Sequence, residues 1–217
     1  MSAQIASETA VADEDLARAH CYALISRLFY APADEGLLRQ LADPGTSVVQ
    51  PEEPQAQSDQ VARAPNAYTS AYASLQNACR RTEAQSVRQE YDDLFAGAGK
   101  ALISPYTSGY AAPHAPDRHL LALRERLINF GLARRDSVFE LEDHVSAVCD
   151  VMRWLIERGR SIDEQRAFFD EFVYAGVSAF CAAIETRAPA SFHQAVAALA
   201  LAFIEIEQHA FELHSGE

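Results

Sequence analysis

Hydrophobic residues recur every three or four positions along most of this chain, which is the spacing of a helix with one buried face. The first such segment spans residues 14 to about 30, and Asp13 stands where a helix cap is expected. Pro32 ends it, and a short helix is predicted at residues 34 to 41. The apolar face of the first segment consists of Cys21, Leu24, Ile25, Leu28 and Phe29.

Residues 43 to 65 lack this period and are rich in Pro, Gln, Ser and Glu, so the sequence predicts a mobile surface loop there. Helical spacing returns at residue 66. A break near residues 82 to 84 then leads into another helix, which Gly97 and Gly99 end. The apolar positions after residue 66 are Tyr68, Tyr72, Leu75 and Cys79.

From residue 116 onward, helical segments follow one another with short connections. The first begins near Pro116 and ends at Gly131, and the second, at about residues 140 to 158, has so wide an apolar arc that a central place is expected. Ser161 or Asp163 caps a long third helix, and Pro189 suits the first turn of the last one. The inward positions expected in these helices are Leu120, Leu123, Leu127 and Phe130; Leu141, Val145, Val148, Val151, Met152, Trp154 and Leu155; Phe169, Phe172, Val173, Gly176, Phe180 and Ile184; and Phe192, Val196, Leu199, Phe203, Ile206, Ala210 and Leu213.

The sequence contains no sustained alternation bounded by hairpin signals and no internal repeat of fixed period. The predicted fold class is therefore all-α, with one domain over residues 1 to 217 and antiparallel helices in a single bundle without a β-sheet. A loop at about residues 96 to 116 is expected to separate the N-terminal and C-terminal helical halves.

The formal net charge of −13 makes nucleic acid an unfavourable partner and favours basic ones. The chain begins without a signal sequence, and no apolar run approaches the roughly 18 residues of a membrane span. These features predict a cytoplasmic protein with no stable membrane insertion. The cysteines lie far apart in apolar helical patterns and are expected to be reduced and buried: Cys21, Cys79, Cys149 and Cys181.

One unusual stretch, residues 90 to 110, reads EYDDLFAGAGKALISPYTSGY. Its first part puts an aromatic and apolar face on a helix, through Tyr91, Leu94 and Phe95. The loop that follows has turn signals around Pro105 and Ser108 and no regular period. A loop this aromatic either packs inward as structure or is shaped to hold a ligand. Its two tyrosines are Tyr106 and Tyr110.

A second stretch, FELEDHVSAV, opens the predicted central helix. Glu140, Glu142 and Asp143 would fall in the first helical turn, where the helix dipole favours acids. His144 shares a flank with apolar residues and has two interpretations. It is either a core histidine bonded to backbone or to a carboxylate, or it lines a groove floor with Asp143, offering a donor and an acceptor to a bound polar chain.

Patterns typical of enzymes and metal sites are missing from the sequence, so neither catalytic residues, metal ligands nor cofactors are predicted. Glu205 and His209 are the nearest approach to a ligand pair, and one such pair on an acidic helix is typical of a solvated face. The turn at Gly97 and Gly99 lacks the second half of a phosphate-binding motif. A helical enzyme using His144 as acid or base would need a further group that the sequence does not supply.

Together the two stretches resemble the TorD/DmsD/NarJ-type redox-enzyme maturation chaperones, with the greatest similarity to the TorD/DmsD branch. The resemblance rests on an aromatic-x-x-Leu-Phe helix at residues 91–95, a Gly-rich turn at residues 97–99, the loop at residues 105–110 and the Glu-x-x-Asp-His segment at residues 140–144. This chain departs from the family pattern at Ala98 and Leu141, where prolines are common, and at Gly109, where a branched residue is more usual.

The resemblance implies an all-α cytoplasmic chaperone rather than an enzyme. Such a protein binds the apo form of a molybdoenzyme catalytic subunit, often through its twin-arginine leader peptide, until the molybdenum cofactor is inserted and before export. Glu142 and Asp143 would then attract the arginines of the leader, beside His144. The apolar wall of the site would come from Tyr91, Leu94, Phe95, Tyr106 and Tyr110, with Pro105 and Ser108 in the same loop.

The alternative is a permanent assembly or structural subunit of an oxidoreductase complex, in which the same motifs serve as core and interface. The sequence is compatible with a monomer and with a domain-swapped dimer, because the stretches near residues 43 to 65 and 110 to 116 could let helices exchange between chains.

Overall fold

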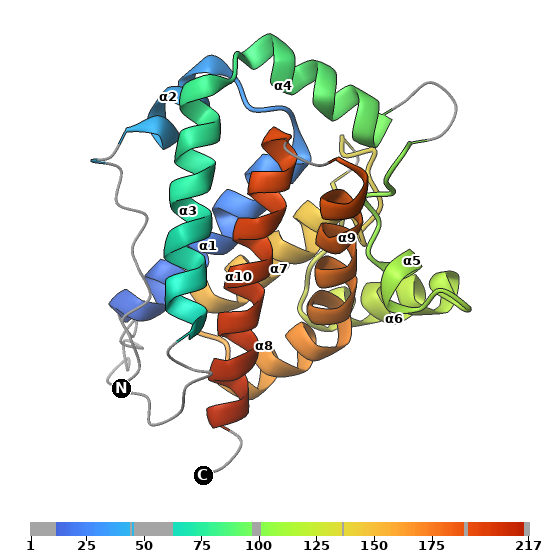
Figure 1. The fold of residues 1–217 in the computed structure, drawn as a ribbon. Helices are drawn as coiled ribbons and strands as arrows, with labels where there is room; N and C mark the ends of the chain where they lie inside the picture. Colours follow the sequence, from blue (N-terminus) through green and yellow to red (C-terminus); the bar gives the residue numbers. More distant parts are fainter. Residues whose placement is uncertain are drawn as a thin grey trace, which may run out of the picture.

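The computed structural model describes residues 12–43, 45, 63–96, 101–135, 137–188 and 191–214. In these ranges the secondary structure is helical apart from one isolated β-bridge, so the predicted all-α bundle is confirmed. Helices α3 (Arg63–Arg81), α10 (Phe192–Leu213) and α9 (Tyr174–Arg187) stand side by side, and α1 (Asp13–Tyr30) and α7 (Val145–Glu157) lie behind them (Figure 1). Their apolar faces form one core.

The N-terminal helices follow the predicted pattern with small shifts. Asp13 does not cap α1, because the helix starts at Asp13 and Ala12 occupies the cap position. The short helix α2 (Glu35–Ala42) is confirmed, and the Asp34 side chain caps it by accepting a hydrogen bond from the Leu37 backbone N–H. Helix α3 begins at Arg63, three residues before the predicted start, while most of the loop predicted at residues 43 to 65 lies outside the described residues.

Helix α4 (Ala84–Tyr91) crosses one end of the bundle and continues into a π-helical turn, η1 (Asp92–Ala96) (Figure 1). The π turn carries Leu94 and Phe95, both buried, as the helical pattern predicted. Gly97 and Gly99, which were predicted to end this helix, lie outside the described residues. Two further helices, α5 (Ser108–Ala111) and α6 (Pro116–Asn129), project from one side of the bundle.

The predicted long third helix is confirmed in extent and in its capping residue. Ser161 and Glu164 form a reciprocal capping box at the start of α8 (Ile162–Phe168), which continues through the π turn η2 (Phe169–Val173) into α9. The run Ile162–Arg187 is long enough to cross a membrane and contains an 18-residue window with a mean hydropathy of 1.5. Half of its most apolar window is buried inside the bundle, where Phe172 and Phe180 enter the core. A core helix therefore accounts for this hydropathy.

The predicted start of the central helix is wrong. Helix α7 begins at Val145, so Glu140, Glu142 and Asp143 precede the helix instead of occupying its first turn. His144 is the capping residue, and its Nδ1 accepts a hydrogen bond from the Ser146 backbone N–H. The physical reason is tertiary, because the backbone just before Val145 pairs with another segment of the chain. Leu141, predicted to face inward, is consequently 38% exposed.

The last helix, α10, starts at Phe192 with Ser191 as its cap, whereas Pro189 lies outside the described residues. Its inward face is as predicted through Phe203, but the face does not extend to Leu213, which is 57% exposed. The four cysteines are free and buried, in agreement with the prediction.

Candidate functional site

Backbone hydrogen bonds join the two unusual stretches of the sequence. Tyr106 and His144 form an isolated antiparallel β-bridge. The Thr107 backbone N–H donates to the carbonyl of Asp143 at 2.8 Å, and the Val145 backbone N–H donates to the carbonyl of Pro105 at 2.9 Å. These bonds occupy backbone groups that a helix beginning at residue 140 would need for itself, which explains the late start of α7.

The position of Thr107 depends on a glycine in the neighbouring helix. A Cβ added at Gly176 would lie 2.7 Å from the Thr107 Cβ and 3.1 Å from its carbonyl oxygen. Only glycine lets α9 approach the backbone of the motif loop this closely. The following short helix, α5, corrects the expectation that residues 96 to 116 would have no regular structure.

Tyr106 links the loop to a carboxylate of the second stretch. Its hydroxyl donates to Glu140 Oε2 at 2.6 Å, and its ring lies edge-on to the His144 ring with centroids 5.8 Å apart. Burial and the hydrogen bond to Glu140 raise the pKa of Tyr106 to about 12. The phenol is therefore neutral at physiological pH and acts as a donor that fixes the orientation of Glu140.

The acidic residues of this segment differ in their partners. Glu142 pairs with Arg124 at 2.9 Å and with Arg134 at 3.5 Å. Burial opposes ionisation, but the hydrogen bond from Arg124 and the neighbouring arginine charges outweigh it and lower the pKa of Glu142. Its negative charge is already matched by the protein's own arginines.

Glu140 and Asp143 have no cationic side chain paired with them among the described residues. Asp143 is only 3% exposed, and its Oδ1 atom is buried without a hydrogen-bond partner. Leaving such an atom unpaired costs roughly 1–3 kcal/mol, and more when it carries charge. Neither carboxylate is neutralised by an arginine of the described residues, and of the two only Glu140, which is partly exposed, is open to a ligand.

His144 is 3% exposed and hydrogen-bonded through Nδ1 to Ser146, at 2.6 Å from the hydroxyl and 3.2 Å from the backbone nitrogen. Because Nδ1 accepts a backbone hydrogen bond, the ring proton belongs on Nε2. Burial lowers the pKa of His144, although the charges of Glu140 and Asp143 act in the opposite direction. The prediction of a core histidine bonded to backbone is confirmed, and the same residue also lines a cleft.

This cleft, of about 540 Å³, lies between α1, α7 and the segment that connects α6 to α7. Tyr30 and Leu141 line it and are partly exposed, at 52% and 38%. Phe139 stands next to two of the lining residues, Val138 and Glu140, and is 91% exposed. Large side chains left this open around a cleft provide apolar surface for a bound partner.

Most of the predicted wall residues are packed beside the cleft and do not line it. Leu94 and Phe95 are buried in the core, and the hydroxyls of Tyr91 and Tyr110 donate to backbone carbonyls, Tyr91 to Tyr30 at 2.9 Å and Tyr110 to Ser104. The predicted residues that line the cleft are Glu142 and His144, and those that lie outside its lining are Tyr91, Leu94, Phe95, Pro105, Tyr106, Ser108, Tyr110 and Asp143.

Sequence reasoning missed several lining residues. Tyr30 ends α1 more than 100 residues before His144, so no local pattern links them. Arg134 and Arg135, which also line the cleft, looked like part of a short connection. Phe139 was the one feature of the sequence that could have indicated the cleft. It is a large aromatic residue beside acids at a predicted helix start, and it does not belong to an apolar face.

An all-α bundle with an open, charged and partly apolar cleft is the architecture of a helical binding protein. More specifically, residues 62–182, over half of the chain and including both motif stretches, match the model of the nitrate reductase delta subunit family, and the chain belongs to that family. This is a family of chaperones for molybdoenzyme maturation, assembly factors that bind molybdoenzyme subunits.

The chain is also similar to a Haemophilus influenzae protein described as uncharacterized. The two are 26% identical over 113 residues, which is 52% of this chain and 55% of that protein. The chain thus spans about half the length of the curated relative it matches.

Proposed function

We propose that this protein binds the apo form of a molybdoenzyme catalytic subunit in the cytoplasm, through a twin-arginine leader peptide, and holds it until the molybdenum cofactor is inserted before export. The observation that carries the proposal is Glu140, a carboxylate in the cleft lining that has no cationic partner among the described residues; the buried Asp143 has none either. A guanidinium group would supply the missing donors and charge.

The motif residues have different roles at the cleft. Glu140 receives arginine and the buried Asp143 acts only through its charge from behind the lining, whereas Glu142, already paired with Arg124 and Arg134, holds the wall of the cleft in place. Tyr106 orients Glu140, and His144 caps α7 next to it. The remaining predicted residues support the motif loop: Leu94, Phe95 and Ser108 are buried, and Tyr91, Pro105 and Tyr110 are partly buried.

The apolar part of the leader would lie against Tyr30, Leu141 and Phe139, the exposed hydrophobic side chains in and beside the cleft. The net charge of −13 adds a long-range attraction for a basic segment and raises its rate of encounter. The greater similarity of this chain to the TorD/DmsD branch is part of this proposal and rests on the motif residues alone.

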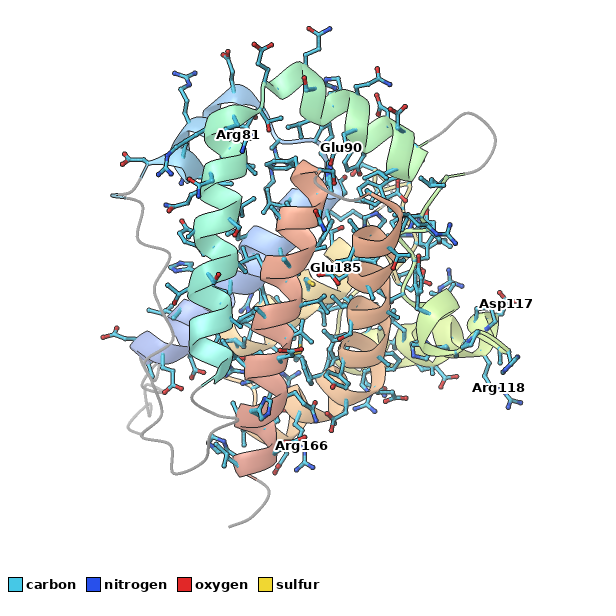
Figure 2. All side chains as sticks on the ribbon, viewed as in Figure 1. Arg81, Glu90, Asp117, Arg118, Arg166 and Glu185 are labelled. Carbon is cyan, nitrogen blue, oxygen red and sulfur yellow. The ribbon has the colours of Figure 1, made fainter. Side chains whose placement is uncertain are left out.

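Peptide binding tests the site. Fluorescence anisotropy would measure the affinity of a synthetic peptide with two adjacent arginines and an apolar segment. The isosteric change Glu140→Gln should weaken binding by about tenfold, the cost of one charge-assisted hydrogen bond, and Asp143→Asn, at a buried position outside the lining, should weaken it less. Glu185→Gln, the same change at an exposed position on α9 (Figure 2), is the matched control and should bind normally. Equal peptide affinity in all variants would show that these carboxylates do not form the peptide-binding site.

A second experiment separates a chaperone from a permanent subunit. The tagged protein would be recovered from its native cells, and the molybdenum content of any co-purifying oxidoreductase would be measured. A chaperone should hold a metal-free catalytic subunit. Recovery of the mature, metal-loaded enzyme in fixed stoichiometry would favour the permanent assembly subunit. Size-exclusion chromatography of the free protein would separately distinguish a monomer from a helix-exchanged dimer.

A further inference from the structure

Three arginines line the same cleft as Glu140: Arg27 from α1, and Arg134 and Arg135 from the segment after α6. The chain carries 31 acidic residues against 18 basic ones, so a concentration of cations inside its cleft is notable. An arginine-binding peptide site needs acids, and these arginines play no part in receiving a basic group. They call for a different explanation.

The positive charge at these arginines is incompletely matched by the surrounding protein. Glu142 is shared between Arg124 and Arg134, so one negative charge faces two positive ones. The Arg135 side chain is exposed and has no hydrogen-bond or ion-pair partner within the part of the chain that the structure describes. Arg27 pairs with Asp34 at 3.7 Å, so the lining combines one carboxylate without a cationic partner, Glu140, with one unpaired guanidinium group, Arg135.

We propose that Arg135, assisted by Arg134 and Arg27, binds an acidic side chain of the same client segment whose arginine is received by Glu140. This inference rests on the proposed function and specifies the peptide further. A peptide with basic groups alone would cover the unpaired Arg135 side chain without giving it a partner, which is costly. A carboxylate at the right distance along the peptide would satisfy it, and its absence would disfavour a wrong client.

The alternative anion, a phosphate group of a small ligand, fits the lining less well. Glu140, Glu142 and Asp150 line the same cleft, and their charges repel a multiply charged phosphate more strongly than a single carboxylate. A peptide that carries both signs can place each charge against its opposite. The observed mixture of acids and arginines therefore favours a peptide that carries both a basic and an acidic side chain.

A charge-exchange experiment tests this inference with the full-length protein. The probes are synthetic peptides with two adjacent arginines and an apolar segment, in which one aspartate is moved along the segment and is replaced by asparagine or lysine at each position. At one or two positions the aspartate peptide should bind about tenfold more tightly than its asparagine counterpart. Arg135→Glu should abolish this advantage and should bind the lysine peptide at that position better than the wild-type protein does.

Arg118→Glu is the matched control, because Arg118 is exposed at the outer end of α6, away from the bundle (Figure 2), and is not part of the cleft lining. This variant makes the same change of net charge and should keep the aspartate preference. A preference lost equally in both variants would show a long-range field effect and would overturn the assignment to Arg135.

The remaining outcomes are equally decisive. If the peptides bind but no position distinguishes aspartate from lysine, the inference fails while the proposed function stands. If inorganic pyrophosphate displaces them from the wild-type protein but not from Arg135→Glu, and aspartate brings no advantage, the arginines serve a phosphate ligand and the inference fails. Absence of binding by every peptide would overturn the proposed function together with the inference.

Discussion

The Glu90 carboxylate holds the start of the last helix by bonding to His193. Glu90 Oε1 accepts hydrogen bonds from the His193 backbone N–H at 2.7 Å and from its Nδ1 at 2.5 Å, while Oε2 accepts from the Phe192 backbone N–H at 3.1 Å. Figure 2 shows Glu90 beside the first turn of α10. A carboxylate here pairs with helix N–H groups and with the positive end of the helix dipole.

Replacing Glu90 with Gln should lower the free energy of unfolding by roughly 1.5–3 kcal/mol at neutral pH, because hydrogen bonds to a charged acceptor are lost. Burial raises the pKa of Glu90, but the hydrogen bonds from His193 outweigh it and the net pKa is lowered below 4.5. The stabilisation is thus present above this value and is lost as the pH falls through the lower folded-state pKa. Urea denaturation of the wild-type protein and Glu90→Gln should show that their difference in unfolding free energy shrinks as the pH falls over this range. A difference that stays constant with pH would contradict this role of the Glu90 charge.

Arg18 and Glu207 form a buried ion pair between α1 and α10. Glu207 is 1% exposed and accepts hydrogen bonds from Arg18 at 2.8 and 2.9 Å and from the Tyr22 hydroxyl at 3.0 Å. Glu207→Ala should cost about 3–5 kcal/mol, because it leaves a buried arginine without its partner. Replacing the pair by Arg18→Met with Glu207→Leu should recover most of the loss.

Asp15 supplies the control for this pair, since it also binds Arg18 at 2.8 Å but its side chain is 41% exposed. Asp15→Ala should change the unfolding free energy by less than about 1 kcal/mol. Denaturant unfolding of the three variants measures the ranking. A double variant as unstable as Glu207→Ala would show that the ion pair specifies the packing and does more than neutralise its own charges.

The close contact between Gly176 and Thr107 gives a third prediction. Gly176→Ala places a Cβ within 2.7 Å of Thr107, whose backbone N–H and hydroxyl are both bonded to Asp143 and resist movement. Overpacking of this kind costs roughly 1–3 kcal/mol, partly offset by the better helix propensity of alanine. Thermal unfolding should show a lower melting temperature.

Gly109→Ala serves as the control, because a Cβ at that position has nothing within 4 Å. Gly109 lies in α5, so alanine there should leave stability unchanged or slightly raised. If both variants melted alike, the approach of α9 to the motif loop would not require a glycine.

The capping role of His144 predicts a pH dependence between neutral and mildly acidic conditions. Burial lowers the pKa of His144 below 6.5, so the unfolded chain takes up this proton more readily than the folded one. The free energy of unfolding should therefore fall as the pH drops below 6.5 and through the folded-state pKa. His144→Asn keeps a good capping residue but cannot titrate.

The measurement is the melting temperature of both proteins at about pH 7.5 and about pH 5.5, on either side of the ordinary histidine value. The wild-type protein should lose more stability between these conditions than His144→Asn. Equal losses would place the acid sensitivity in other groups of the protein.

Periodicity predicted most of the fold because a bundle helix must bury one face, and apolar residues therefore recur every three or four positions along the chain. In the long third helix, the positions predicted to face inward between Phe169 and Ile184 are buried. Periodicity failed at the start of α7, where Leu141 continues the apolar pattern. Backbone pairing of Pro105 and Thr107 with the second motif ends the helix there, and such long-range pairing leaves no trace in the local period.

The sequence by itself determined the helical class, most of the core and the importance of the two motif stretches, because each depends on neighbours along the chain. Only the tertiary structure decided which carboxylate is already paired. Arg124 and Arg134 come within reach of Glu142, while Glu140 meets the Tyr106 hydroxyl. Tyr30 and Arg135 likewise meet in the cleft wall only through folding. Charge pairing and cleft shape depend on distances in space, which the spacing of residues along a chain does not specify.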